Sequence, residues 1–268
     1  MSSEFVFEEG DPVHVGSPVE NNFVYAEGDL VSDGDISDFS FIEDRGFGAS
    51  SVLFYQNASS DWSNETMVSR LESEYGIQAE YLERAGGWSI DEALDEVQPA
   101  VFCIMHTGED GVSGAVSQGE IDAVAERWDA GMNIMSGTED TDASNITEAA
   151  NPILEACVGT GPWDTLDSDA AIFGADNECT TNFPAGQHAI FDESSTIYRR
   201  RSEQAIIDNP APFTAVWSDD DNSWAYYDEG TSRIWCDQYP RFDLDRIDGC
   251  SGNTTAADRA ILWLLNQI

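Results

Sequence analysis

The chain has 268 residues, and its 52 acidic side chains are set against only 11 basic ones, all arginine, so the formal net charge is −41. This charge disfavours binding to nucleic acid, whose phosphates would repel the protein, and adsorption to an anionic membrane. The acids are spread along a sequence that is 41% hydrophobic with eight tryptophans, which argues against a disordered chain. Like charges at this density oppose a compact fold, but at about 1 M salt the screening length falls to about 3 Å. We therefore expect a folded protein adapted to concentrated brine.

The apolar runs and the N-terminal segment bear on localisation. No run approaches the roughly 20 apolar residues that a membrane-spanning helix needs. The first residues, with Phe5 and Phe7 among glutamates, have neither the basic region nor the apolar core of a secretory signal peptide. We expect a chain that is made in a cytoplasm, is not exported by the general route and is not inserted into a membrane.

Residues 1–48 contain a short repeat and differ from the rest of the chain. The segment 5–13, Phe-Val-Phe-Glu-Glu-Gly-Asp-Pro-Val, matches the segment 23–31, Phe-Val-Tyr-Ala-Glu-Gly-Asp-Leu-Val, at six of nine positions. In each copy an apolar triplet, Phe5-Val6-Phe7 or Phe23-Val24-Tyr25, suits a short strand and precedes a Glu-Gly-Asp turn signal. Such strands have too little apolar surface for a core of their own. We expect residues 1–48 to form an extended docking arm that pairs with another chain by strand addition.

Residues 49–268 show alternating strand and helix patterns. Short apolar runs, of which 100–105 is the strongest, suit buried strands, and in the stretch 117–130 Ile121, Val124 and Trp128 fall on one helical face. Strands separated by helices of this length imply right-handed crossovers and a mainly parallel sheet. We expect an α/β domain, a three-layer flavodoxin-like sandwich. The expected strands are 52–55, 77–82, 100–105 and 132–135, and the expected helices are 64–75, 90–97, 117–130 and 146–158, the first half of the last disfavoured by Pro152.

The periodicity weakens beyond Gly161. The apolar runs in this part predict β-rich additions to the same domain at about 165–250, and they span 170–173, 188–191, 213–217 and 223–227. The final segment, 254–267, predicts a helix that packs back onto the sheet, with Asn253 or Thr254 as its N-cap.

Five cysteines lie far apart in the sequence. No Cys-x-x-Cys spacing occurs, so a zinc knuckle is not expected. Cys103 lies inside an apolar run and suits the core. Cys179, Cys236 and Cys250 lie in loop-like sequence, where some of them could pair, and the connectivity stays open.

Two parts of the α/β region resemble the class I glutamine amidotransferase-like superfamily. One is Val-Phe-Cys-Ile-Met-His-Thr-Gly at 101–108 with the helix and strand that follow it to residue 135, and the other is the ending 252–265. The likeness is greatest to non-catalytic members with trehalose-utilisation or intraflagellar-transport type domains, and it supports the fold more than any activity. The catalytic apparatus does not carry over, because Cys103 lies mid-strand without flanking glycines and no late His-x-Glu follows.

Polar residues after the expected parallel strands form a candidate ligand pocket. In open α/β sheets, ligands bind at the carboxyl ends of the strands. This position favours Asn57, His106, Glu109 and Glu139. The alternative is that these acids belong to a brine-adapted surface, and we assign no catalytic residue.

Asp219, Asp220 and Asp221 are candidate ligands for a hard cation, which prefers carboxylate oxygens. The alternative is an exposed acidic turn, and the glycine and distal glutamate of an EF-hand are absent. We expect no cofactor, although Na⁺, K⁺, Mg²⁺ or Ca²⁺ ions could bind.

Arg199, Arg200 and Arg201 form the one cationic cluster of the sequence. Forked guanidinium groups suit an anchor to an acidic partner. The alternative is local neutralisation of acids such as Asp192 and Glu193.

Two hypotheses of function follow. The Phe-Val-Phe/Tyr-x-Glu-Gly-Asp repeats resemble docking segments at the start of virion proteins of haloarchaeal tailed viruses. This resemblance implies a non-enzymatic structural protein of the virion, a turret, tail fibre or decoration subunit. Its partners would be other virion proteins, further copies of itself, and a host-surface protein or glycan. The second hypothesis is a cellular halophilic amidotransferase-like enzyme or ligand-binding module that uses the His106 loop.

Overall fold

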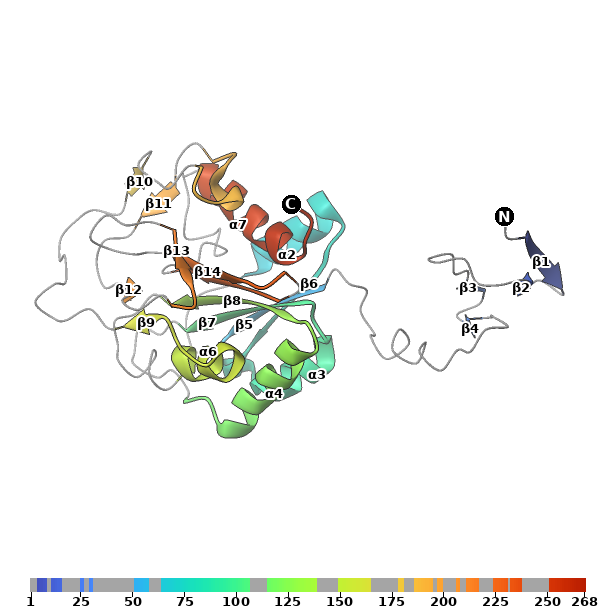
Figure 1. Ribbon diagram of the computed structural model, residues 1–268, viewed down its shortest axis with the longest axis horizontal. Helices are drawn as coiled ribbons and strands as arrows, with labels where there is room; N and C mark the ends of the chain where they lie inside the picture. The colour runs from blue at the N-terminus through green and yellow to red at the C-terminus, as the bar shows by residue number, and fades with distance from the viewer. Residues whose placement is uncertain are drawn as a thin grey trace, which may run out of the picture. The chain divides into compact units, whose positions relative to one another are not determined.

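The computed structural model describes residues 4–8, 11–15, 25–26, 29–30, 51–57, 64–106, 115–138, 149–164, 178–180, 186–194, 197–199, 206–207, 211–216, 224–230, 232–237 and 251–268 (Figure 1). The chain divides into two compact units, Met1–Gly46 and Phe47–Ile268. Each unit is described by itself below.

The first unit contains two β-hairpins. Strand β1 (Glu4–Glu8) pairs antiparallel with β2 (Asp11–Val15), and β3 (Tyr25–Ala26) pairs antiparallel with β4 (Asp29–Leu30). The strands predicted at the apolar triplets are present, β1 over the whole first triplet and β3 at the end of the second. These described strands pair within the unit, and the prediction that residues 1–48 form an extended docking arm stays a prediction.

The second unit is built on a seven-stranded sheet with the order β13-β14-β15-β8-β7-β5-β6. All neighbouring pairs from β6 to β15 are parallel, whereas β14 and β13 are added antiparallel. The prediction of an α/β domain with a mainly parallel sheet is therefore confirmed. The strands are β5 (Ser51–Gln56), β6 (Gln78–Glu83), β7 (Val101–His106), β8 (Asn133–Thr138), β13 (Thr214–Ala215), β14 (Trp224–Asp228) and β15 (Arg233–Asp237).

Helices cover both faces of this sheet (Figure 1). They are α2 (Glu65–Arg70), which continues as the π-helical turn η2 (Leu71–Tyr75), α3 (Ile90–Val97), α4 (Gln118–Asp129), α6 (Asn151–Val158) and α7 (Ser251–Leu264). Among the described residues, no helix is both long and apolar enough to cross a bilayer.

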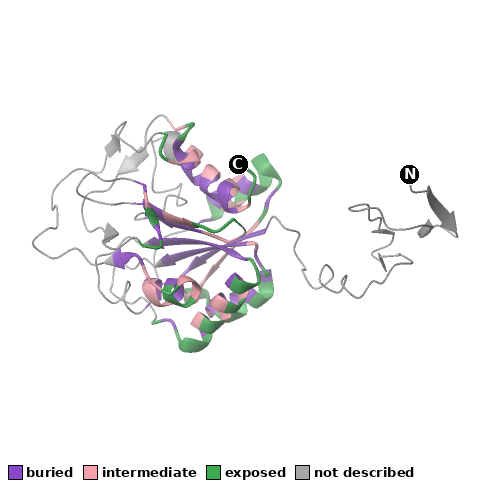
Figure 2. Cartoon of the chain, viewed as in Figure 1, coloured by how far each residue is buried: buried purple, intermediate pink, exposed green. Residues whose placement is uncertain are grey.

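The alternation of β5 shows how the core is divided. Leu53 and Tyr55 pack with α3, α4 and α6, whereas Val52 and Phe54 pack with α2 and α7, because successive side chains of a strand point to opposite faces. All four side chains are fully buried, and the sheet lies in the buried centre of the unit (Figure 2). A strand buried on both faces needs a continuous apolar run, which is the pattern in the sequence.

Local signals explain where the helices begin and end. The side chains of Ser89 and Ser117 each accept a hydrogen bond from the backbone amide three residues later, and the carboxylate of the glutamate at that position accepts one from the serine amide. Helices α3 and α4 therefore both start with a capping box. Gly131, at φ 97°, ends the turn after α4 in a conformation that disfavours side chains. Helix α6 spans Asn151–Val158 with Pro152 in its first turn, where proline is tolerated, and the two residues before it, 149–150, are in a π-helical turn.

Three sequence predictions are wrong. The run 188–191 forms the 3₁₀ turn η5 (Ala189–Phe191) instead of a strand. Helix α7 already begins at Ser251, so Asn253 and Thr254 lie inside it rather than at its cap. Cys236 is a buried free thiol within β15 and not a loop cysteine available for pairing, whereas Cys103 is a core residue as expected.

The part from about 165 to 250 contains strands, as predicted. Besides β13, β14 and β15, it holds β10 (Glu178–Thr180), β11 (Ile197–Arg199) and β12 (Ile206–Ile207), the last paired with β9 (Trp163–Asp164). Strand β15 was not expected, and it extends the parallel sheet itself by pairing with β8. The predicted strand 170–173 and Cys250 lie outside the described residues.

Candidate functional site

The carboxyl ends of the parallel strands lie side by side in register. Gln56 of β5 pairs with Met105 of β7, which pairs with Gly137 of β8, which in turn pairs with Asp237 of β15. One residue further along, His106 pairs with Thr138, and Asn57 follows Gln56 directly. Strands β5 and β7 are also the point at which the chain order of the sheet reverses, where open α/β sheets bind ligands.

Asn57 is fully buried at this edge and belongs to a polar network. The backbone N–H of Asn57 donates a hydrogen bond to the backbone carbonyl of Met105 at 2.9 Å, and its side-chain oxygen accepts one from Nε of Arg84 at 2.8 Å. Nη2 of Arg84 donates to Oε1 of Glu120 at 2.7 Å. Arg84 follows β6 and Glu120 lies in the first turn of α4, so the network joins the ends of β5 and β6 to the start of a helix.

Glu120 caps two helices at once. Its Oε1 accepts from the Ile90 amide at the start of α3 at 3.0 Å, and its Oε2 accepts from the amide and hydroxyl of Ser117 at 2.8 and 2.9 Å. Burial alone would raise the pKa of this carboxyl, but the hydrogen bonds from Ile90, Ser117 and Arg84 outweigh it and lower the pKa below its ordinary value. Glu120 is therefore an ionised positioning residue that holds Arg84, and not a proton donor.

Asp237 and Gly137 define the neighbouring part of the edge. Oδ1 of Asp237 accepts from Nε1 of Trp224 at 3.0 Å, and Asp237 is only 1% exposed. A Cβ built on Gly137 would lie 3.0 Å from Sδ of Met105, so the packing here accommodates glycine best.

Of the predicted pocket residues, the structure describes Asn57 in full and His106 by its backbone alone. His106 is the last residue of β7, one register position beyond Met105. Glu109 and Glu139 lie outside the described residues, as do Asp219, Asp220 and Asp221. Among the described residues, no group of three His, Cys, Asp or Glu is arranged to hold a metal.

Sequence reasoning missed Arg84 and Glu120. The Ser-x-x-Glu spacing at 117–120 was a visible capping signal, and Arg84 is one of only 11 cations and directly follows a strand. The sequence does not show that these two residues, which are 36 positions apart in the chain, form a hydrogen bond in the folded domain.

Three cysteines, Cys103, Cys157 and Cys236, are not poised for nucleophilic chemistry. Burial raises the pKa of the Cys103 thiol well above its ordinary value. The pKa of the Cys236 thiol is raised as well, mainly by burial and to a smaller extent by the charge of Asp237. Burial also raises the pKa of Cys157, to about 12. A nucleophilic cysteine needs its thiolate, which these environments disfavour.

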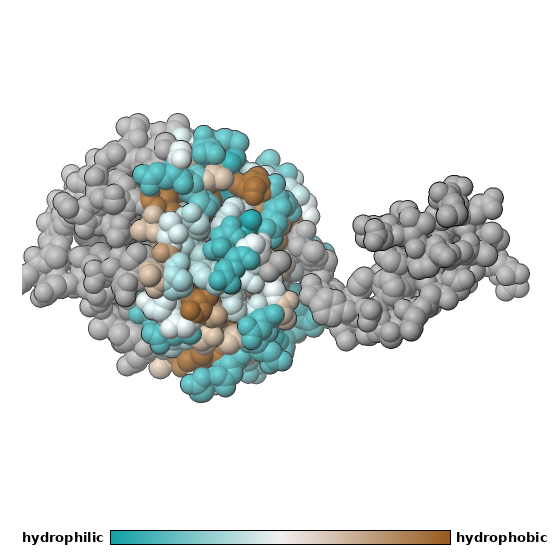
Figure 3. All heavy atoms as spheres, viewed as in Figure 1, coloured by the Kyte–Doolittle hydropathy of each residue, from teal (hydrophilic) through white to brown (hydrophobic). Residues whose placement is uncertain are grey.

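The arginine cluster is described only at its first member. Arg199 ends β11 and pairs in register with Glu178 of β10, while Arg200 and Arg201 lie outside the described residues. Trp224 of β14 and Trp235 of β15 are each 1% exposed and belong to the core. On the face shown in Figure 3, the described surface is mostly hydrophilic, with separate small apolar spots.

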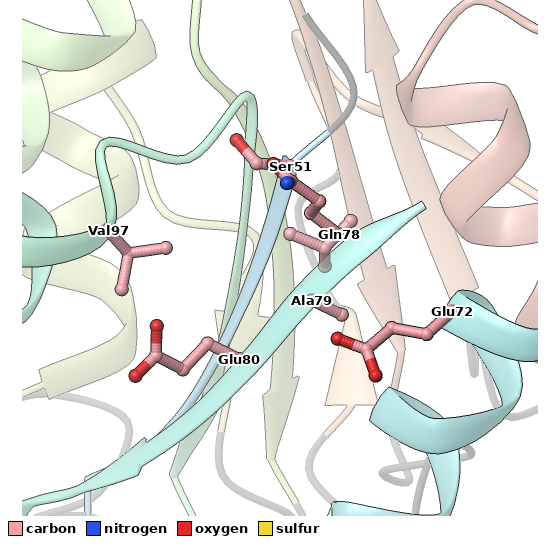
Figure 4. A pocket seen from close by; sticks show the side chains of 7 residues that line it. Ser51, Glu72, Gln78, Ala79, Glu80 and Val97 are labelled. Atoms are coloured by element: carbon pink, nitrogen blue, oxygen red, sulfur yellow. The ribbon is translucent and has the colours of Figure 1, made fainter. Parts of the chain in front are cut away.

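A hollow of about 230 Å³ lies at the opposite, amino-terminal end of the sheet. Glu80 and Val97 lie on one side of β6, and Glu72 and Ala79 on the other (Figure 4). The two carboxylates therefore do not converge on one point, and the hollow follows the edge strand. Its lining residues are Ser51, Val52, Glu72, Gln78, Ala79, Glu80 and Val97.

Comparison with known proteins shows what kind of fold this is. No family model matches the sequence, and no curated protein matches it. Among solved structures, the chain is similar to one described as "mmIFT52 N-terminal domain", with a TM-score of 0.51 and 13% identity over 80% of this chain and 97% of that chain. Identity this low shows a shared α/β fold and nothing about activity.

Proposed function

We propose that the chain is a non-enzymatic structural protein of a virus of halophilic archaea, a turret, tail fibre or decoration subunit. The observation that carries this proposal is the duplicated hairpin unit that precedes the α/β domain. A two-stranded hairpin is marginally stable by itself in water, because it has no second layer against which to bury its apolar residues. The proposal gives residues 1–48 that second layer on another virion protein, reached by strand addition.

In this proposal the apolar triplets of the repeats, 5–7 and 23–25, contact the partner, and Arg199, Arg200 and Arg201 anchor an acidic surface. Phosphate-rich and anionic-lipid surfaces are unsuitable partners for a chain of net charge −41. The displayed domain would contact other copies of the chain and a host-surface protein or glycan, within the virion, and bound Na⁺, K⁺, Mg²⁺ or Ca²⁺ would help to balance the acids.

The domain is best described as a flavodoxin-like three-layer sandwich of the amidotransferase-like kind without catalytic residues. The order β6-β5-β7-β8-β15 corresponds to the 2-1-3-4-5 order of flavodoxin-like sheets, with β15 in the fifth place, which supports this assignment. The likeness to the mmIFT52 N-terminal domain supports it too. The buried Cys103 supports a non-enzymatic role, because the strand cysteine cannot act as the nucleophile.

The test is fractionation of the native source in concentrated salt, followed by electron microscopy. The full chain is expected to sediment with a large particle, and a variant lacking residues 1–48 is expected to stay free while keeping the circular dichroism of its folded domain. If the shortened chain still enters the particle, the docking role is refuted. If the full chain sediments as a free protein, the structural role itself is refuted.

A second candidate function is a ligand-binding module that uses the carboxyl edge of the sheet. The observation in its favour is Arg84, held by Asn57 and Glu120 at the point where the strand order reverses, with its side chain 27% exposed. A guanidinium fixed in this way suits a carboxylate or phosphate group of a small ligand. A thermal-shift screen of carboxylates and phosphates in concentrated KCl would reveal such a ligand, and Arg84→Gln should abolish the shift.

A further inference from the structure

The two hairpins of the first unit share the register of the two residue pairs next to the strand connection, although β1 and β2 pair over five positions and β3 and β4 over two. Phe7 lies opposite Pro12 in the first hairpin, and the equivalent Tyr25 lies opposite Leu30 in the second. In both, the same dipeptide, Glu-Gly, connects the strands, at the same place relative to the ladder. Because the period of a strand is two residues, a slip of one position would exchange the faces of the hairpin, so equal register means that equivalent residues share equivalent faces.

We propose that the hairpins are two equivalent binding units that engage two equivalent sites on neighbouring subunits of a homo-oligomeric partner. The inference rests on the docking role proposed above and specifies the partner. A partner site that recognises the strand pairing and the aromatic residue of one hairpin would recognise the other hairpin in the same way. Identical sites at a fixed spacing are what adjacent subunits of a symmetric assembly provide.

The connecting segment limits how far apart the two sites are. Residues 16–24 join the end of β2 to the start of β3. At about 3.5 Å per residue, the distance from Val15 to Tyr25 is at most about 35 Å. This span is comparable with the width of a small protein domain, so neighbouring subunits lie within reach.

Joining two weak units raises the affinity without any new kind of contact. Once one hairpin is bound, the other is held near its site at an effective concentration of about 1 mM, and the gain over a single unit is about 10²- to 10⁴-fold. A duplicated hairpin that is individually weak can in this way hold a subunit firmly, which suits a permanent structural role.

The test compares matched substitutions in the full chain. Phe7→Ser, Tyr25→Ser and the double variant are each co-sedimented, in concentrated KCl, with native particles stripped of this chain. Each single variant is expected to weaken binding by at least about 10²-fold and by similar factors, and the double variant should not bind measurably. As controls, Phe7→Tyr and Tyr25→Phe exchange the residues that the repeat already uses at this position, and both should bind as the unaltered chain does.

The outcomes separate this inference from the docking role. If one single variant abolishes binding and the other leaves it unchanged, the two hairpins are not equivalent. If neither single variant weakens binding, the two hairpins do not bind at the same time. Either result overturns the inference but leaves the docking role intact. If the unaltered chain does not bind the stripped particles, or if removal of residues 1–48 has no effect, both ideas are overturned.

Discussion

At the scale of single residues, Glu120 accepts hydrogen bonds from three different residues through one buried carboxylate. It caps α3 and α4 and holds Arg84, while only 4% of its surface is exposed. Replacing it with the neutral amide in Glu120→Gln leaves Arg84 with a weaker partner and places an amide nitrogen where backbone donors converge. We expect the free energy of unfolding to fall by about 2–4 kcal/mol in denaturant titration.

Glu126→Gln is the matched control for this change. Glu126 lies on the same helix, carries the same charge and is exposed. Its substitution should change the free energy of unfolding by no more than about 0.5 kcal/mol. Equal effects of the two substitutions would show that net charge, and not the cap network, is responsible.

His188 is a second residue whose surroundings set its behaviour. Its ring lies 4.7 to 5.1 Å from the ring centres of Tyr226, Trp263 and Trp235. Burial lowers the pKa of His188 to about 4, opposed by Asp192 and Asp228 and aided by Arg233. The imidazole therefore stays neutral in the folded protein at a pH where the unfolded chain already binds a proton.

The sign of the pH effect follows from this difference. Below about pH 6.5 the imidazole binds a proton in the unfolded state but not in the folded state. The free energy of unfolding therefore falls as the pH is lowered towards about 4. Between pH 7 and pH 5 we expect His188 to account for at most about 2 kcal/mol. Denaturant titrations at both pH values give the loss of unfolding free energy between pH 7 and pH 5 for the unaltered chain and for His188→Gln. The loss should be smaller in the variant, and an equal loss in both proteins would contradict the prediction.

The candidate site shows how far sequence reasoning reaches at this scale. Asn57 and His106 were placed at the sheet edge from their position after apolar strands, and the structure puts both residues there. Arg84 and Glu120 were missed because their meeting depends on how β6 ends relative to α4, which no local pattern encodes. The acidic background also concealed Glu120, since one glutamate among 52 acids carries little information by itself.

At the scale of elements, the scarce arginines act as clamps between them. Among the described side chains, Arg70 joins α2 to Asp258 of α7, and Arg127 joins α4 to Asp95 of α3. Arg233 of β15 donates to the Trp263 carbonyl of α7 at 2.6 Å and also lies over the Trp263 ring. In each of these three cases the partner lies on another element of the fold.

The two helix clamps differ in burial, which allows a matched test. The side chain of Asp258 is 3% exposed and accepts from Nε and Nη2 of Arg70 and from the Tyr75 hydroxyl, whereas that of Asp95 is 77% exposed. Arg70→Gln should cost about 2–4 kcal/mol, because it leaves a buried carboxylate without its cation. Arg127→Gln, the same substitution at an exposed pair, should cost less than about 1 kcal/mol. Similar losses measured by denaturant titration would refute a role for burial.

The helices and strands from β5 to α4 could be predicted from the sequence, because the local sequence pattern of each one matches the burial it has in the folded domain. Strands buried on both faces are continuous apolar runs, and α3 and α4 begin at serines with a glutamate three residues later. The signal failed at 188–191, where an apolar run packs against α7 as a single 3₁₀ turn, and at β15, whose five residues begin and end with charges. At both places tertiary packing decided the conformation.

At the scale of the whole molecule, the net charge of −41 makes stability a property of the solution as well as of the chain. Most acids have no cation available, since there are only 11 arginines. Repulsion among exposed carboxylates opposes folding until salt screens it, and the screening length falls from about 10 Å at 0.1 M to about 3 Å at 1 M. The free energy of unfolding should therefore rise steeply with KCl up to the molar range, as measured by urea titration at fixed KCl.

The repulsion can also be reduced within the chain itself. Glu96, Glu126 and Asp129 are exposed on α3 and α4. The triple variant Glu96→Gln/Glu126→Gln/Asp129→Asn keeps every arginine and lowers the formal charge from −41 to about −38. It should unfold at a lower KCl concentration than the unaltered chain when salt is withdrawn, and the two should converge in molar KCl, where screening makes the removed charges irrelevant. If the variant needs more salt, the acids stabilise the fold by binding cations rather than opposing it by repulsion.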